Sequence, residues 1–165
     1  MKTPANDRPA ADEEAIRTAC MRSWAGFDRN DLDLFLAAFT ADATMSLFGG
    51  TQMVDIAAIA AGGDLATPFE NSSHAPANQV ITIEGDAAVA DTLVVAHVMG
   101  PSGPIGVRGL RYIDNLTRTD QGWRIHRRQH LVLWQYDVDR VAPHVPSERG
   151  AQRGGTRMTA PPTRD

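Results

Sequence analysis

Asp28 and His74 are the two residues whose types and positions best suit acid–base chemistry in this chain of 165 residues. Asp28 directly follows an apolar helical stretch that contains Trp24 and Phe27, so burial of that helix face draws its carboxylate toward the interior. His74 opens a long β-rich segment, and imidazole is the natural general base near neutral pH. A carboxylate bonded to the other ring nitrogen fixes the tautomer and stabilises the imidazolium. The pair therefore fits a general base and the acid that orients it.

Position alone leaves other interpretations of both residues open. Asp28 also fits a turn aspartate in solvent, and His74 also fits a surface or core histidine with satisfied hydrogen bonds. Cys20, the only cysteine, lies in an apolar helical pattern, and we interpret it as a buried small hydrophobe rather than a nucleophile. The sequence has no Gly-x-Ser-x-Gly motif and no Gly-rich phosphate loop, so nucleophilic serine or cysteine chemistry has no support.

His126 and His130 stand four residues apart on a predicted strand, where regular alternation places both on one face. Two such histidines can bind a metal. No third ligand is evident, and neighbouring arginines disfavour a cation. We therefore predict no metal site, and we interpret Arg124, Arg127 and Arg128 as a solvated or subunit-facing stripe.

Composition excludes several classes of protein. The net charge is -4 and the pI is near 5.7, which argues against a nucleic-acid partner, because phosphate binding needs a basic face. No apolar run approaches the roughly 20 residues that span a bilayer, and the N-terminal residues do not resemble a signal peptide. A single thiol forms no internal disulfide and gives no sign of an oxidising compartment. We expect a cytoplasmic protein with no membrane partner.

Helices are expected first and an antiparallel meander second, which defines the α+β class. Residues 12–140 are predicted to form one domain, preceded by a flexible stretch (1–11) and followed by a disordered tail (141–165) rich in Pro, Gly and Arg. Asp31 is expected to cap the second helix. The predicted helices are one that starts at Asp12, then 32–39 and 53–61, and the predicted strands are 44–48, 73–84, 87–99, 106–119 and 123–136.

Several short motifs resemble the SnoaL-like branch of the NTF2-like superfamily. They are Gly26-Phe27-Asp28-Arg29-Asn30-Asp31-Leu32, His74-x-x-x-Asn78, Gly85-Asp86-Ala87-Ala88, Gly109-x-x-Tyr112-x-Asp114 and Arg118-Thr119-Asp120-x-Gly122-Trp123-Arg124-Ile125, within residues 12–136. The resemblance implies a cone-shaped α+β barrel, with three N-terminal helices packed on a strongly curved, mainly antiparallel sheet.

The same resemblance implies a catalytic pair. In family members that eliminate or isomerise, such as scytalone dehydratase, the bile-acid 7α-dehydratase and hexachlorocyclohexane dehydrochlorinase, an Asp ending the first helix holds a His that starts the long strand. Asp28 and His74 match those positions. The helper tyrosine and late-strand arginine of these relatives have no counterpart in the stretch from Cys20 to Trp24 or, by ungapped counting, at Val132.

Four more residues are predicted to line the pocket. Trp24 is expected to wall it, with core packing as the alternative. Tyr112 fits a donor to a substrate oxygen or a packed tyrosine bonded to the backbone. Asn78 fits a pocket residue or one that fixes strand geometry. His97 lies near a second site histidine of scytalone dehydratase, and a one-residue offset reverses its face of the strand.

We therefore expect a lyase or isomerase, with dehydration first, then isomerisation or cyclisation. The expected substrate is a small apolar cyclic, polyketide- or steroid-like molecule, and the expected reaction uses no cofactor. The alternative is a non-catalytic binding or assembly subunit that resembles the β subunit of ring-hydroxylating dioxygenases. Relatives commonly form dimers or trimers, and the apolar strand from Leu93 to Met99 favours a homodimer or homotrimer here.

Overall fold

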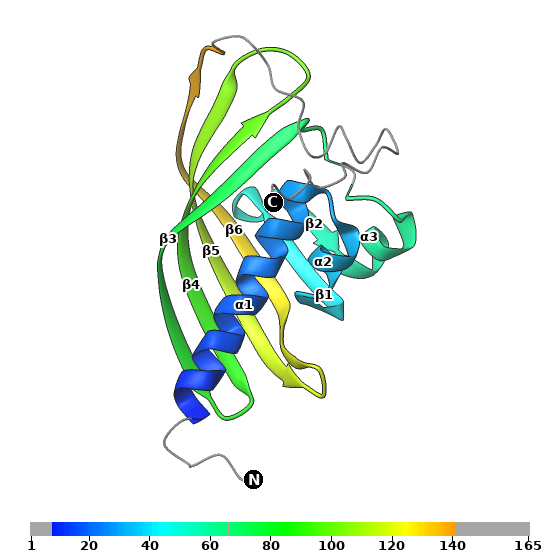
Figure 1. Cartoon of the computed structure of the whole chain (residues 1–165), viewed down its shortest axis with the longest axis vertical. Helices are drawn as coiled ribbons and strands as arrows, with labels where there is room; N and C mark the ends of the chain where they lie inside the picture. The colour runs from blue at the N-terminus through cyan, green and yellow to red at the C-terminus, as the bar shows by residue number, and fades with distance from the viewer. Residues whose placement is uncertain (1–7, 66, 141–165) are drawn as a thin grey trace, which may run out of the picture.

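The computed structural model describes residues 8–65 and 67–140 of the chain (Figure 1). The predicted tail at 141–165, and residues 1–7 of the predicted flexible start, lie outside the described residues. The helices are α1 (Arg8–Arg29), α2 (Leu32–Leu36), α3 (Ile56–Gly62) and the short 3₁₀ helix η1 (Phe48–Gly50). The strands are β1 (Phe39–Leu47), β2 (Gln52–Asp55), β3 (Asn71–Glu84), β4 (Ala87–Met99), β5 (Ile105–Thr119) and β6 (Gly122–Val138).

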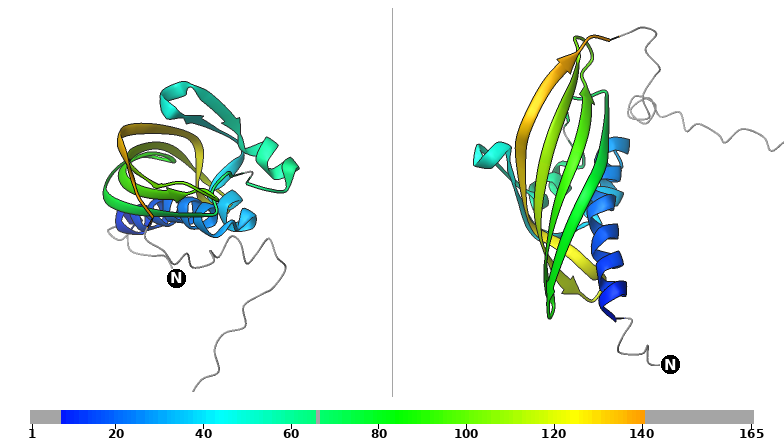
Figure 2. Two further views of the ribbon diagram at one scale, coloured as in Figure 1. Left: turned by 90° about the horizontal axis from the view of Figure 1, so that it is seen from above. Right: turned by 90° about the vertical axis from the view of Figure 1, so that its left-hand side faces the viewer.

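The strands form one curved sheet in the order β2-β1-β6-β5-β4-β3. Strands β3 to β6 are the predicted antiparallel meander, while β1 pairs with β6 in parallel and with β2 antiparallel. Seen from above, the long strands arch over α1 (Figure 2). The predicted α+β class and cone-like shape are confirmed. None of the described helices is long and apolar enough to cross a membrane.

Helix α1 begins at Arg8, four residues before the predicted start at Asp12. Asp12 is therefore not in the first turn, and its carboxylate serves a tertiary contact instead. It accepts hydrogen bonds from Arg118 Nη1 at 2.8 Å and Nη2 at 2.6 Å, and from Trp123 Nε1 at 3.2 Å. These bonds fasten the first turns of α1 to the β5–β6 hairpin, because Arg118 and Trp123 flank its turn.

The other end of α1 is fixed by a close approach to α2. A β-carbon on Gly26 would lie only 2.4 Å from the backbone nitrogen of Phe35, so only glycine fits at this crossing. Asp31 caps α2 as predicted, with its Oδ1 accepting from the Leu34 amide at 2.9 Å. Asp28 follows two residues after Gly26 in the last turn of α1, so this crossing fixes the backbone that carries its carboxylate.

The segment between α2 and β3 differs most from the prediction. Strand β1 starts at Phe39 rather than Thr44, and α2 ends at Leu36. Met53 lies in the short strand β2, not in a helix, and α3 begins only at Ile56. Strand β2 is mostly exposed, so it carries no alternation of buried and exposed residues from which a strand is predicted.

Strand β6 contains a bulge that changes which side chains point inward. Leu116 pairs with Ile125 while Asn115 pairs with Arg127, so His126 is the extra residue. Ile125 and Arg128 are both buried although three positions separate them. A bulge reverses the alternation of faces along a strand, and this one turns Arg128 toward the inside of the cone.

Candidate active site

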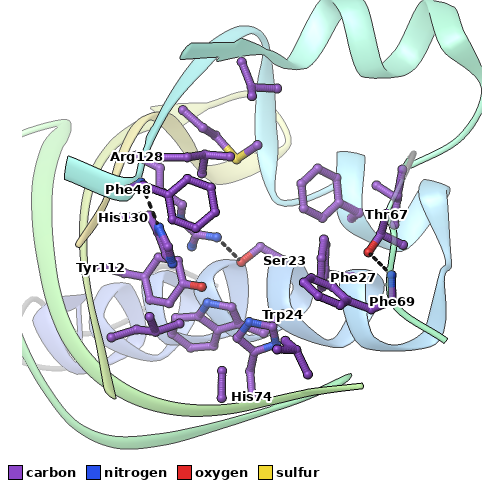
Figure 3. A pocket seen from close by; sticks show the side chains of 18 of the residues that line it. Ser23, Trp24, Phe27, Phe48, Thr67, Phe69, His74, Tyr112, Arg128 and His130 are labelled. Carbon is purple, nitrogen blue, oxygen red and sulfur yellow. Dashed lines mark hydrogen bonds between the residues drawn. The ribbon is translucent and has the colours of Figure 1, made fainter. Parts of the chain in front are cut away.

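A cavity of about 440 Å³ lies between α1, the concave face of the sheet and the segment from β1 to β3 (Figure 3). Most of its lining is apolar, with Phe27, Phe48 and Phe69 among the aromatic side chains. The polar side chains are few, which is typical of a small-molecule site. They are Ser23, Gln52, Thr67, His74, Arg108, Tyr112, Arg128 and His130.

Asp28 and His74 are directly hydrogen bonded. His74 Nδ1 lies 2.8 Å from Asp28 Oδ1, and the His74 backbone N–H donates to Asp28 Oδ2 at 2.8 Å. The Ser72 hydroxyl donates to Asp28 Oδ1 at 2.6 Å. One carboxylate thus fixes both the ring and the backbone of His74. Since Nδ1 is engaged, Nε2 is the ring nitrogen left for a ligand, and His74 lines the cavity.

The environment keeps Asp28 ionised. Burial alone raises the pKa of its carboxyl group, but the hydrogen bond with the His74 ring, the attraction of that ring whenever it is protonated, the Ser72 hydroxyl and the His74 amide together hold that pKa below its usual value. The His74 side chain is 7 % exposed, and its ring meets Phe27 edge-on at 5.6 Å between centroids. A charged acceptor on one side and apolar walls on the other are what a general base requires.

His130 is held neutral in a single tautomer. The Phe48 amide donates to His130 Nδ1 at 3.2 Å, so the proton of the neutral ring is on Nε2. Burial and the positive charge of Arg128 lower the pKa of His130 to about 4. Phe48 reaches this position with φ of +52°, a strained backbone for a bulky residue. The pocket therefore contains an uncharged N–H donor.

Arg128 and Asp114 form a buried ion pair beneath the cavity. Arg128 Nε donates to Asp114 Oδ1 at 2.6 Å and Nη2 to Oδ2 at 2.7 Å. Its third donor, Nη1, bonds the Ser23 hydroxyl at 2.8 Å, and Ser23 in turn donates to the Cys20 carbonyl. The guanidinium also lies 4.8 Å from the centre of the Tyr112 ring. Arg128 is thus satisfied by protein groups on several sides.

The structure places two of the predicted pocket residues in the lining and two outside it. Trp24 and Tyr112 line the cavity with His74, and their rings lie 5.5 Å apart. Asn78 and His97 do not line it, and both are exposed. His97 lies between the buried Ala96 and Val98, so its strand position points it outward. Asn78 stands at an irregularity of β3, opposite Leu93.

Arg108, Arg128 and His130 line the cavity and were not predicted to do so. The bulge at His126 also separates the two histidines of the metal hypothesis, because His126 is exposed while His130 is buried. No group of three or more potential metal ligands occurs among residues 8–65 and 67–140. The regular alternation assumed from the sequence was wrong at this point.

A strongly curved sheet packed against a long helix, with an apolar pocket on the concave face of the sheet, is typical of the NTF2-like class of α+β proteins. Residues 8–129 match the model of the SnoaL-like domain. The chain belongs to this family. No curated protein sequence matches it.

Solved structures share the fold. A candidate scytalone dehydratase from Novosphingobium aromaticivorans has a TM-score of 0.70 at 20% identity, over 86% of this chain and 94% of that one. A candidate aromatic ring hydroxylase from the same species has a TM-score of 0.70 at 25% identity, over 83% and 96%. The hexachlorocyclohexane dehydrochlorinase LinA-type3 from Novosphingobium barchaimii has a TM-score of 0.71 at 15% identity, over 85% and 100%.

Proposed function

We propose that the protein is a lyase-type enzyme, with dehydration of a small apolar cyclic substrate as its reaction. The observation that carries the proposal is the 2.8 Å bond between Asp28 and His74 Nδ1 at the wall of an apolar cavity. Two relatives of the same fold have names of eliminating enzymes, a candidate scytalone dehydratase and a dehydrochlorinase. Isomerisation and cyclisation begin with the same proton transfer and are the next candidates.

His74 Nε2 takes a proton from the carbon next to a substrate carbonyl, and Asp28 stabilises the imidazolium that forms. The electron pair of the broken C–H bond becomes the new C=C bond. The β-hydroxyl leaves, takes up the proton that His74 has gained and departs as water, which restores the neutral imidazole. No electrons enter or leave the substrate, so the proposed reaction needs no cofactor.

The developing negative charge on the carbonyl oxygen needs a donor. Two pocket groups are protonated at neutral pH and suit this role. Burial raises the pKa of Tyr112, which keeps its hydroxyl a donor, and neutral His130 retains its Nε2–H. We propose that these two groups replace the tyrosine and arginine helpers that the sequence lacks at the family positions.

The test is turnover of a panel of cyclic β-hydroxyketones by His74→Ala and Asp28→Asn. Loss of a general base predicts turnover about 10²–10⁴-fold lower, with the fold retained by circular dichroism. Ser73→Ala is the matched control, since Ser73 is the adjacent residue on the outer, exposed face of β3. Folded variants that keep wild-type turnover would refute the role of His74 as general base. If both variants unfold and no substrate is turned over, Asp28 and His74 have a structural role instead.

The second candidate is an assembly subunit, because one relative at 25% identity has the name of a candidate aromatic ring hydroxylase. In that case the chain co-purifies with a large iron–sulfur subunit and turns nothing over alone. Expression in its native host, followed by pull-down and iron analysis, separates the two candidates.

We also propose that the chain forms a homodimer or homotrimer through the outer face of the sheet. Large apolar side chains are exposed there, with Leu93 38%, Leu133 52% and Trp134 47% exposed. Burial of such side chains between copies stabilises an oligomer. Light scattering should give a multiple of 17.8 kDa for the wild type and a smaller mass for Trp134→Ser; a monomeric wild type would refute the proposal.

A further inference from the structure

One cation in the pocket wall has no counter-charge among residues 8–65 and 67–140. Arg108 lines the cavity from β5, and among the described residues no carboxylate forms an ion pair with it and no acceptor takes its hydrogen bonds. Its guanidinium carbon lies 5.9 Å from the centroid of the Phe69 ring. Removing part of a guanidinium from water without a counter-charge costs free energy, and an anionic group of a bound ligand would offset that cost.

Arg128, the other arginine of the pocket, has a full set of protein partners and so serves as a comparison for Arg108. Its guanidinium has two bonds to Asp114 and one to Ser23. Arg108 has none of these, although both side chains line one cavity. No Asp or Glu is among the described residues that line the pocket, so the wall has a positive charge that its own lining does not neutralise.

A second donor in the pocket is also without an acceptor. The indole Nε1 of Trp24 is buried and has no hydrogen-bond partner in the part of the chain that the structure describes, and Trp24 is 4 % exposed. Buried donors are nearly always paired, so an oxygen of a bound ligand is the expected acceptor. Figure 3 shows the Trp24 indole beside His74 and Tyr112, at the end of the cavity where the proposed chemistry occurs.

The register of the sheet relates Arg108 to the base. His74 pairs with Ala96, and Ala96 pairs with Arg108, so the three stand in one row across β3, β4 and β5. Adjacent strands are about 4.8 Å apart, which separates the α-carbons of His74 and Arg108 by about 10 Å. The residue between them is an alanine, whose small side chain leaves room for a ring to bridge the two.

We propose that the substrate of this pocket is a cyclic carboxylic acid, whose carboxylate is bound by Arg108 while an oxygen near its reacting carbon accepts from Trp24 Nε1. The proposal rests on the proposed function for its reacting carbon, and it adds the chemical class of the substrate. The planar guanidinium pairs with a carboxylate through two parallel bonds. Arg108 is then a binding residue that sets specificity for acids over neutral analogues.

The test is calorimetric binding of a matched pair of probes, naphthalene-2-carboxylate and naphthalene-2-carboxamide, with benzoate and benzamide as a smaller pair. A charge-assisted bond predicts that the acid binds the wild type about 10- to 100-fold more tightly than the amide. In Arg108→Gln the two should bind within about threefold, and Arg108→Lys should keep part of the preference. Arg111→Gln is the control, because Arg111 is on the opposite, exposed face of β5 and should keep all of it.

His74→Ala separates this proposal from the proposed function. It should lose turnover and keep the preference for the acid, since Arg108 is intact. If the preference for the acid depends on Arg108 but His74→Ala keeps its turnover, the proposed function is overturned and the carboxylate proposal stands. Equal binding of acid and amide, binding of neither, or an unchanged preference in folded Arg108→Gln would overturn the carboxylate proposal, even if neutral ketones are turned over.

Discussion

Asp114→Asn should be one of the most destabilising near-isosteric substitutions in this protein. Asp114 is 0% exposed and Arg128 3%, so their charges are removed from water and depend on each other. Asparagine keeps the volume but presents an N–H₂ group to the guanidinium donors and removes the counter-charge. Breaking a buried pair from one side costs about 3–5 kcal/mol. The two bonds here are short, 2.6 and 2.7 Å, so we expect the free energy of unfolding to fall by an amount within that range.

The assay is urea unfolding followed by circular dichroism. With a slope of about 2 kcal/mol per molar urea, the midpoint should fall by about 1.5–2.5 M. Adding Arg128→Met should recover part of the loss, because the buried charge is then gone. Asp91→Asn, at the exposed Arg111–Asp91 pair, is the control and should hardly move the midpoint. A midpoint for Asp114→Asn that equals the Asp91→Asn midpoint would refute the argument.

Three further predictions concern stability and reactivity. His130 has a pKa of about 4 in the folded chain against 6.5 unfolded. The free energy of unfolding of the wild type should therefore fall by up to about 3 kcal/mol as pH falls from about 6.5 to 4. In urea titrations at each pH, His130→Gln should lose less, and an identical dependence on pH would contradict the lowered pKa of His130. Gly26→Ala should lower the thermal midpoint, since its β-carbon meets the backbone of α2 at 2.4 Å, whereas Gly62→Ala, with nothing within 4 Å, should leave it equal or higher. Cys20 is 0% exposed and burial raises its pKa, so a thiol reagent should label it only in denaturant; labelling of the native protein would show that α1 opens.

The meander of the fold was predictable because long strands bury one face. Strands β3 to β6 begin and end within about two residues of their predicted limits, since alternation and tight-turn residues mark them. The segment before them was not predictable to the same degree. Strand β2 is short and exposed, and β1 is paired in parallel with the distant β6, a partner that no local pattern specifies. Helix α1 extends four residues further back than its acidic residues suggested, and Asp12 pairs with Arg118 rather than marking the first turn.

The candidate site was predictable where a family motif marks it and not where strand register decides it. The positions of Asp28 and His74 came from the resemblance, and the structure places the two side chains 2.8 Å apart. Arg128 was predicted to be part of a solvated or subunit-facing stripe because no sequence pattern indicates the bulge at His126. One inserted residue reverses the faces of a strand, so His130 also became a pocket residue. The unpaired state of Arg108 is a tertiary property, since only the assembled pocket shows that no carboxylate of the described residues forms an ion pair with it.

The edge position of β2 has a consequence for how this pocket can change over evolutionary time. Within the described part of the chain, β2 pairs in the sheet only with β1, and the stretch made of residues 48–65 and 67–69 supplies eight of the residues that line the cavity. Asp28 and His74 are anchored elsewhere, by the end of α1 and the start of β3. Insertions and deletions in that one stretch therefore reshape the cavity without moving Asp28 or His74, so the shape of the pocket can diverge among descendants while the bond between these two residues is inherited intact.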